Sequence, residues 1–197
     1  MHAYSIDSDE RRNITIILVV LGIGAAWALN RALVAADITI PWWVDVPAGF
    51  GFAGFFYALF ERWAWRLGLW HIVGLVTAPD LSGQWAGYIT SSHDSHAAGY
   101  EISVHIKQTW TRMSVVLKTE TSRSCSIVAS LSTQASNGPE LTYTYRNEPL
   151  PHSVGTMSIH YGTATIRLGD EGQRLEGDYY SGRGRETYGS ITVHRVR

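Results

Sequence analysis

Two long apolar runs lie in the first third of the chain. One covers Ile14–Leu29 and contains no charged residue, and the second covers Val46–Phe60 with tryptophans on both sides. A membrane-spanning helix needs about 20 mainly apolar residues, and tryptophan prefers the level of the lipid headgroups. The pattern therefore predicts two transmembrane helices, at about 14–34 and 42–61, joined as a hairpin.

Two other structures are compatible with the same runs. Two buried helices of a soluble protein would need cover on all sides from the 118 residues after Pro79. A cleaved signal peptide is the second alternative, because Arg11 and Arg12 precede the first run and Val34–Ala36 resembles a cleavage site. Acidic residues before the first run disfavour it. Two arginines precede the first span and two follow the second, whereas one lies between the spans. Because positive residues favour the cytoplasmic side of a membrane, this slight excess predicts that both termini are cytoplasmic.

Small residues recur at a spacing of four in both runs. The pairs are Gly22 with Ala26 and Gly54 with Ala58. This spacing allows two helices to approach closely in a bilayer. Chance in spans that are rich in glycine and alanine explains it equally well.

The segment Trp63–Thr77 is also apolar but is interrupted by Arg66 and His71. It either prolongs the second helix or lies along the membrane surface. Pro79 ends it, because proline disfavours helical backbone at the preceding residue. Residues 1–79 are thus predicted to form a transmembrane region with a juxtamembrane segment.

After residue 80 the hydrophobic period changes to two, the period of a half-buried strand. The clearest strand is Tyr100–Gln108, where apolar and polar side chains alternate. Seven further strands are predicted, at Gln84–Thr90, Arg112–Thr119, Arg123–Thr133, Glu140–Asn147, Ser158–Leu168, Arg174–Ser181 and Glu186–Arg195. The fold class is therefore membrane-anchored all-β. Residues 80–197 are predicted to form an eight-stranded antiparallel up-and-down β-barrel, with a two-sheet sandwich as the alternative.

The alternation also assigns one face of each strand to the barrel interior. Glycines at positions 87, 162, 177 and 189 fall on this face, where they either leave open volume or bend the wall. Polar groups on the same face near strand ends are Gln108, Arg123, Asn147 and His160. A cavity with aromatic walls and a few polar groups is typical of a small-molecule site.

Composition separates the two regions further. All five phenylalanines lie before residue 80, whereas eight of the ten tyrosines lie after it. Residues 80–197 carry 11 basic and 11 acidic residues, and the whole chain has a net charge of −1. This balance argues against a DNA or RNA polymer as partner. The single cysteine, Cys125, excludes an intramolecular disulfide framework and is predicted to be buried and inert.

No catalytic arrangement is predicted. The segment His93–His96 contains the letters of a hydrolytic triad and an HxxH spacing. Neighbours in one loop cannot face one another as a triad requires, and no third metal ligand is evident. The protein is expected not to be an enzyme and to bind neither a cofactor nor a metal.

Several short motifs occur in an order that resembles a known family. They are PDLSGQWAGY (79–88), QTW (108–110), SRSCS (122–126), YRNEP (145–149), HYGTA (160–164) and LEGDYYSGRGRETYG (175–189). Together with the two apolar runs, they resemble the two-transmembrane, β-strand-rich effectors of CBASS antiphage operons. The resemblance implies a multi-pass protein of the bacterial inner membrane with a cytoplasmic barrel.

The resemblance also implies a ligand and an outcome. The barrel would bind a cyclic oligonucleotide second messenger, with a cyclic dinucleotide favoured, made after phage infection by a partner CD-NTase. Binding would drive homo-oligomerisation of the helices, disruption of the lipid bilayer and abortive-infection cell death.

A cyclic dinucleotide carries two phosphates and two bases, so its site needs cations and flat stacking surfaces. We predict three cations, three stacking platforms and two groups that contact base edges: Arg123, Arg183, Arg185, Tyr145, Tyr179, Trp110, Asn147 and His160. An ordinary solvated turn at 181–185 and plain core packing of the tyrosines are the alternatives for these residues.

Two other functions remain open at this point. One is a membrane-tethered, lipocalin-like barrel that carries or senses an apolar ligand, which a cavity without arginine would favour. The other is a structural membrane scaffold, which a barrel filled by side chains would favour.

Overall fold

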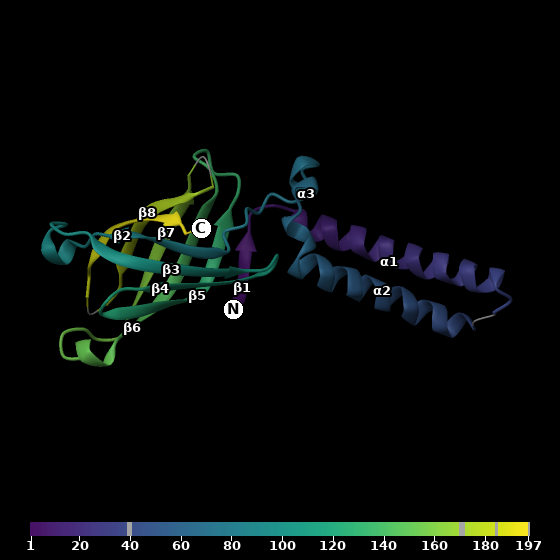
Figure 1. Cartoon of the computed structure of the whole chain (residues 1–197), viewed down its shortest axis with the longest axis horizontal. Helices are drawn as coiled ribbons and strands as arrows, with labels where there is room; N and C mark the ends of the chain where they lie inside the picture. The colour runs from purple at the N-terminus through teal and green to yellow at the C-terminus, as the bar shows by residue number, and fades with distance from the viewer. Residues whose placement is uncertain (39–40, 170–171, 184, 197) are drawn as a thin grey trace. The chain divides into compact units, whose positions relative to one another are not determined.

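The computed structural model describes residues 1–38, 41–169, 172–183 and 185–196. The chain divides into two compact units. One unit combines Met1–Asp7 with Ala78–Arg197, and the other is Ser8–Thr77 (Figure 1). The first seven residues therefore belong with the strand-rich part of the chain, although they precede the first apolar run.

The strand-rich unit is a closed β-barrel, and the sandwich alternative is wrong. Its described residues form nine strands: β1 (His2–Ile6), β2 (Gly83–Ile89), β3 (Tyr100–Gln108), β4 (Arg112–Lys118), β5 (Ser122–Ser132), β6 (Glu140–Pro149), β7 (His160–Leu168), β8 (Arg174–Ser181) and β9 (Tyr188–Arg195). Neighbours from β2 to β9 are consecutive and antiparallel, and β2 pairs with β9 to close the ring. The up-and-down order of these eight strands is as predicted.

The ninth strand, β1, corrects the predicted strand number. It pairs antiparallel with β4, at His2 and Met113, and parallel with β5, at Tyr4 and Ala129. The strands β4 and β5 pair directly with each other at the opposite end, from Val116 to Lys118. β1 thus fills the gap where β4 and β5 separate. The alternation missed it because five residues beside a charged stretch carry too short a pattern.

A β-bulge in β5 corrects a second expectation. The register shifts between Ser126 and Val128, and such a shift moves side chains to the other face of the sheet. Before the bulge, Ser124 is buried and Arg123 is exposed. The prediction that Arg123 and Cys125 face the interior is therefore wrong, and Cys125 is only half-buried.

Glycines on the inner face lie where strands approach one another closely. A Cβ added to Gly177 would collide with the carbonyl oxygen of Thr165 and would lie 2.8 Å from the Ile166 Cα. A Cβ on Gly87 would meet the backbone of Thr192 and Val193 in the same way. The space that a side chain would take at these glycines is occupied by the backbone of a neighbouring strand. Of the two predicted roles, the glycines therefore allow the wall to bend and do not leave open volume.

We expect Gly177→Ala to destabilise the barrel by about 2 kcal/mol, because the new methyl group forces two strands apart. Urea unfolding of the full chain in detergent, followed by tryptophan fluorescence, measures the change. Gly155→Ala is the matched control, since a Cβ there meets nothing within 4 Å. Equal unfolding midpoints for the two variants would contradict the role of Gly177 in curvature.

One end of the barrel is filled by side chains. Trp85 and Trp110 are at most 1% exposed, and Trp85 donates from Nε1 to the Leu81 carbonyl at 3.1 Å. The Gln108 side chain accepts from the Leu81 N–H at 2.8 Å and donates to the Pro79 carbonyl at 3.1 Å. Gln108 is thus an interior residue, as predicted, that holds the chain where it enters the barrel.

Asp7 fixes the end of β1 to the segment that follows β5. Its carboxylate accepts hydrogen bonds from the Ser132 hydroxyl at 2.7 Å, from the N–H and hydroxyl of Thr133 at 2.8 Å each, and from the Gln134 N–H at 3.2 Å. Slight desolvation raises the pKa of Asp7, but these hydrogen bonds outweigh it and lower the pKa from 3.8 to about 2.

A carboxylate whose pKa is lower in the folded state than in the unfolded state stabilises the fold at any pH above its unfolded-state pKa. This stabilisation is lost as the pH falls through the folded-state pKa. We therefore expect the free energy of unfolding to decrease between about pH 4 and pH 2, in part through Asp7. Urea titrations across this range should show a shallower pH dependence for Asp7→Asn. An unchanged pH dependence in Asp7→Asn would show that Asp7 contributes nothing.

The second unit is helical. It contains α1 (Glu10–Ala35), α2 (Trp42–Arg62), the 3-10 turn η1 (Ala64–Arg66) and the short helix α3 (Gly68–Ile72). Within the described ranges, α1 is the one helix long and apolar enough to cross a membrane. Its 26 residues extend about 39 Å, which exceeds the bilayer hydrocarbon core of about 30 Å. Its apolar side chains are mostly exposed, which disfavours the alternative of buried helices in a soluble protein.

The helices α1 and α2 lie side by side (Figure 1). A Cβ on Gly22 would lie 2.6 Å from the Ala53 backbone nitrogen, and a Cβ on Gly49 would lie 3.9 Å from the Ala26 Cβ. Gly22 and Ala26 therefore form the close approach on α1, as their spacing predicts. On α2 the facing residues are Gly49 and Ala53, and the predicted Gly54 meets nothing within 4 Å.

The juxtamembrane segment does not prolong α2. The helix ends at Arg62 and is followed by η1 and α3, which expose Leu69 and Ile72 to 60% and 84%. The segment then returns to the start of α1, where the Glu10 carboxylate accepts from the N–H and hydroxyl of Thr77 at 2.7 and 2.8 Å. The two ends of the helical unit are thus held together.

Candidate ligand-binding site

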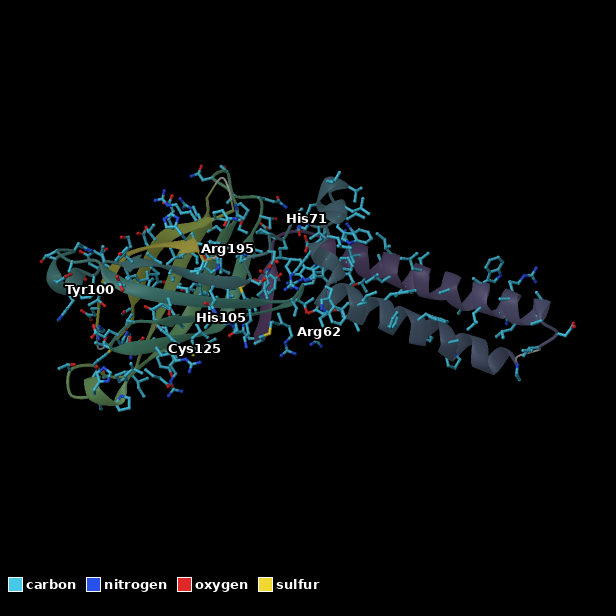
Figure 2. The ribbon with its side chains drawn as sticks, in the orientation of Figure 1. Arg62, His71, Tyr100, His105, Cys125 and Arg195 are labelled. Atoms are coloured by element: carbon cyan, nitrogen blue, oxygen red, sulfur yellow. The ribbon has the colours of Figure 1, made fainter. Side chains whose placement is uncertain are left out.

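A cavity of about 1060 Å³ lies at one end of the barrel. At this end β2, β4, β6 and β8 finish and β3, β5, β7 and β9 begin, so strand ends and their connections surround the mouth. Figure 2 labels Tyr100, which lines the cavity, at this end of the barrel and Arg195 toward the filled end. The cavity shows that the interior is not filled throughout, which disfavours a purely structural scaffold.

Five of the eight predicted binding residues line this cavity: Tyr145, Asn147, His160, Tyr179 and Arg185. The other three lie elsewhere. Arg123 points outward because of the bulge in β5, and Arg183 is exposed in the β8–β9 turn without reaching the lining. Trp110 is buried in the filled end, where its carbonyl accepts from the Tyr4 hydroxyl at 2.8 Å.

Asn147 and His160 form a polar pair on the cavity wall. They are register partners on β6 and β7 and are 4% and 6% exposed. The Ser124 hydroxyl donates to Asn147 Oδ1 at 2.7 Å, so the amide nitrogen is directed away from Ser124 and donates to the Met157 sulfur at 3.3 Å. The strands and Ser124 therefore hold the amide in one orientation.

His160 is held as a neutral acceptor. Its Nδ1 lies 3.0 Å from the Ser158 carbonyl, which can only accept, so Nδ1 carries the proton and Nε2 has a lone pair. Burial lowers the pKa of His160 below 6.5, the Ser158 hydrogen bond opposes this shift, and the positive charge of Arg185 reinforces it. The imidazole is therefore uncharged at neutral pH.

Tyrosines form the apolar part of the lining. The rings of Tyr143 and Tyr145 are 6.3 Å apart and inclined by 55°, and burial raises the pKa of both hydroxyls. Tyr179 is half-buried and donates from its hydroxyl to the Thr90 carbonyl at 3.1 Å. The rings of Tyr145 and Tyr179 thus give the cavity flat surfaces that are fixed by the barrel.

Among the described residues of the lining, Arg185 and Lys118 carry a permanent positive charge. Arg185 lies in the β8–β9 turn, and its charge influences the pKa of both His160 and Tyr145. Lys118 is the last residue of β4, exposed on the same outward face as its register partner Arg123, and it joins the lining at the rim. Glu101 and Glu120 also belong to the lining, so any attraction for an anion depends on the placement of the two cations and not on bulk charge.

Comparison with known proteins identifies the family. A family model described as the Cap15 cyclic dinucleotide receptor domain matches residues 76–195, and one described as Cap15 TM helices matches residues 12–66. The chain belongs to the Cap15 family. This confirms the resemblance to the two-transmembrane, β-strand-rich effectors, and together with α1 it indicates a membrane-anchored protein. The strand β1 lies outside both matched ranges.

A curated relative supports the same family. CD-NTase-associated protein 15 of Yersinia aleksiciae is 32% identical over 142 residues, which is 71% of this chain. The alignment spans 65% of the relative's own length, so about a third of that protein has no aligned counterpart here.

Sequence reasoning missed several residues that line the cavity of this Cap15 family member. The alternation that puts Arg123 on the inner face puts Ser124 on the outer one, because the bulge in β5 leaves no mark in the sequence pattern. Met157 follows η3 (Pro151–Ser153), in a connection where no periodicity exists to assign a direction. Lys118 falls on the outward phase of β4, and only its position at the strand end brings it to the rim.

Proposed function

We propose that this protein is a CBASS effector whose barrel binds a cyclic dinucleotide second messenger. The observation that carries this proposal is the lining of the cavity, which combines Arg185 and, at the rim, Lys118 with tyrosine rings and the Asn147–His160 pair. Strands β2 to β9 form a ring of eight, in which β4, β3, β2, β9 and β8 follow one another. The end of β4 and the β8–β9 turn are therefore on nearly opposite sides of the barrel mouth. β1 does not enter this count, because it pairs at the other end.

A cyclic dinucleotide has a matching shape. Its two phosphates lie on opposite sides of the macrocycle, and its two nucleosides occupy the remaining sides. Two cations on one diameter of the mouth suit the phosphates, since charge-assisted hydrogen bonds to phosphate are among the strongest in proteins. The two remaining sides of the mouth are formed by the strand pairs β6–β7 and β2–β3, which lie opposite each other, four strands apart in the ring. These two sides are available for the bases. Tyr145 and Tyr179 supply surfaces for stacking.

The apolar-ligand alternative is less well supported. A lipocalin-like carrier would line its cavity with apolar side chains and would bury no cation against its ligand. Here Arg185 and the Asn147–His160 pair are part of the lining. The cavity volume of about 1060 Å³ is at the upper end of the usual range for ligand sites, which suits a ligand of two nucleotides.

The chain path supports a transmembrane hairpin. Residues before Ser8 and after Thr77 belong to the same barrel, so both ends of the helical unit are on one side of a membrane. The number of crossings between them must then be even. If α1 crosses once, α2 is the segment that returns, which agrees with the match to the TM-helices model over residues 12–66. We assign this side to the cytoplasm, because lysine and arginine are slightly more frequent outside the hairpin than between its helices, and we take the membrane to be the bacterial inner membrane.

The proposed outcome follows from joining a receptor to such a hairpin. A ligand made by a CD-NTase after phage infection would bring barrels together, and the raised local concentration would promote association of the helices. Homo-oligomers of these hairpins would disrupt the lipid bilayer and cause abortive-infection cell death. The close α1–α2 approach at Gly22 and Ala53 is compatible with small-residue packing of this kind.

Isothermal titration of the full chain in detergent tests the receptor function. The ligands are the diguanosine, diadenosine and mixed guanosine–adenosine cyclic dinucleotides, with a long-chain fatty acid as the apolar comparison. We expect binding of at least one cyclic dinucleotide with one ligand per chain and no heat from the fatty acid. Binding of the fatty acid alone would favour the carrier, and binding of none would overturn the receptor.

A further inference from the structure

We infer that the site recognises the two bases of its ligand unequally, with the Asn147–His160 pair selecting the base on one side only. This inference rests on the proposed cyclic dinucleotide function and adds a rule for ligand selection. It starts from a geometric fact. A cavity inside a single barrel has no twofold axis, so the two halves of the ligand meet different residues.

The β6–β7 side carries a built donor and acceptor. The Asn147 amide donates to the Met157 sulfur, a weak acceptor that a carbonyl or ring nitrogen of a base would replace at little cost. Its register partner His160 offers the Nε2 lone pair. A donor beside an acceptor complements a base edge that presents an acceptor beside an N–H group. Both purines have such an edge but in opposite order, N6–H then N1 in adenine and O6 then N1–H in guanine, so a donor and acceptor in fixed positions fit one purine better than the other. Both side chains are nearly buried on paired strands, so their positions are fixed before the ligand arrives.

The β2–β3 side is chemically different. Its lining includes Ile89 and Tyr100, and the Tyr100 hydroxyl is donated to the Asp94 carboxylate at 3.1 Å. His93 also lines this side, but it is exposed on the turn η2 (Ser92–Asp94) and no strand fixes it. Glu101 also belongs to the lining here, but it is exposed on the outward phase of β3, whereas Tyr100 and Ile102 share the inward phase. A base between the inward residues is therefore held by contact with apolar and aromatic surface, which tolerates every base because each has a flat face.

Unequal recognition predicts a specific ranking of three ligands. The site should prefer one symmetric cyclic dinucleotide over the other, because the fixed order of the Asn147 donor and the His160 acceptor matches the edge of only one of the two purines. The mixed ligand should then bind within about twofold of the better symmetric ligand, since it needs to present its preferred base in only one of two orientations. Equal recognition of both bases would instead place the mixed ligand midway between the symmetric ones on a logarithmic scale.

The experiment is isothermal titration of the unmodified full chain in detergent with the diguanosine, diadenosine and mixed ligands. For a tenfold or larger difference between the symmetric ligands, a mixed-ligand affinity within about twofold of the better one supports the inference. A midway affinity, or equal affinities for both symmetric ligands, overturns it. Binding of none of the three overturns the receptor function itself, so the two failures are distinguishable.

A variant locates the selection at the pair. His160→Phe retains an aromatic ring but removes the acceptor, so the preferred symmetric ligand should lose about tenfold in affinity while the weaker one changes little. His194→Phe, which replaces an exposed histidine of β9 outside the lining, is the matched control and should leave the ratio between the ligands unchanged. A uniform loss for all three ligands in His160→Phe, or an unchanged ratio, would overturn the role of the pair.

Discussion

Replacing Arg185 with methionine should weaken binding of every cyclic dinucleotide about 10- to 100-fold. A hydrogen bond between a charged donor and a charged acceptor is worth about 1.5–3 kcal/mol, and about 1.4 kcal/mol corresponds to a factor of ten. Arg185 is only partly exposed and belongs to the lining of the cavity. Methionine preserves much of the length of the side chain and removes the charge.

The control for this variant lies in the same turn. Arg183→Met removes an exposed arginine that does not line the cavity and should change the affinity less than threefold. Isothermal titration of both variants in detergent, at low and moderate salt, makes the comparison, and Arg185→Met should also reduce the salt dependence of binding. Equal affinities for Arg185→Met and the unmodified protein would show that another residue binds the phosphates.

Tyr4→Ala should destabilise the barrel by about 4 kcal/mol. Tyr4 is 2% exposed, and loss of a buried aromatic side chain costs about 3–5 kcal/mol. Its hydroxyl also donates to the Trp110 carbonyl, which would lose that donor. If residues 2–6 were a disordered tail, the same substitution would leave stability almost unchanged. The measurement therefore tests whether β1 is an integral strand of the barrel.

Urea unfolding of the full chain in detergent measures this effect. Ser5→Ala, one residue further along β1 with its side chain exposed, is the matched control and should change stability by less than about 0.5 kcal/mol. Equal midpoints for Tyr4→Ala and Ser5→Ala would mean that β1 detaches from β4 and β5 without cost.

The sequence by itself determined the parts of the fold that depend on long, regular patterns. Eight strands in up-and-down order follow from the period-two alternation, and the apolar helix follows from a run without charges. The pattern also placed Asn147, His160 and Tyr145 on the inner face, since each belongs to a strand whose phase is uninterrupted. For these residues, local alternation is sufficient because one face of every strand must be buried.

Only the tertiary structure decided where that local rule fails. The bulge in β5 turned Arg123 outward and Ser124 inward, because one extra residue reverses the phase of the strand. The strand β1 owes its place to partners more than 100 residues away, which no local pattern encodes. Barrel closure brought the end of β4, with Lys118, and the β8–β9 turn, with Arg185, to nearly opposite sides of the ring, although the two residues are far apart in the chain.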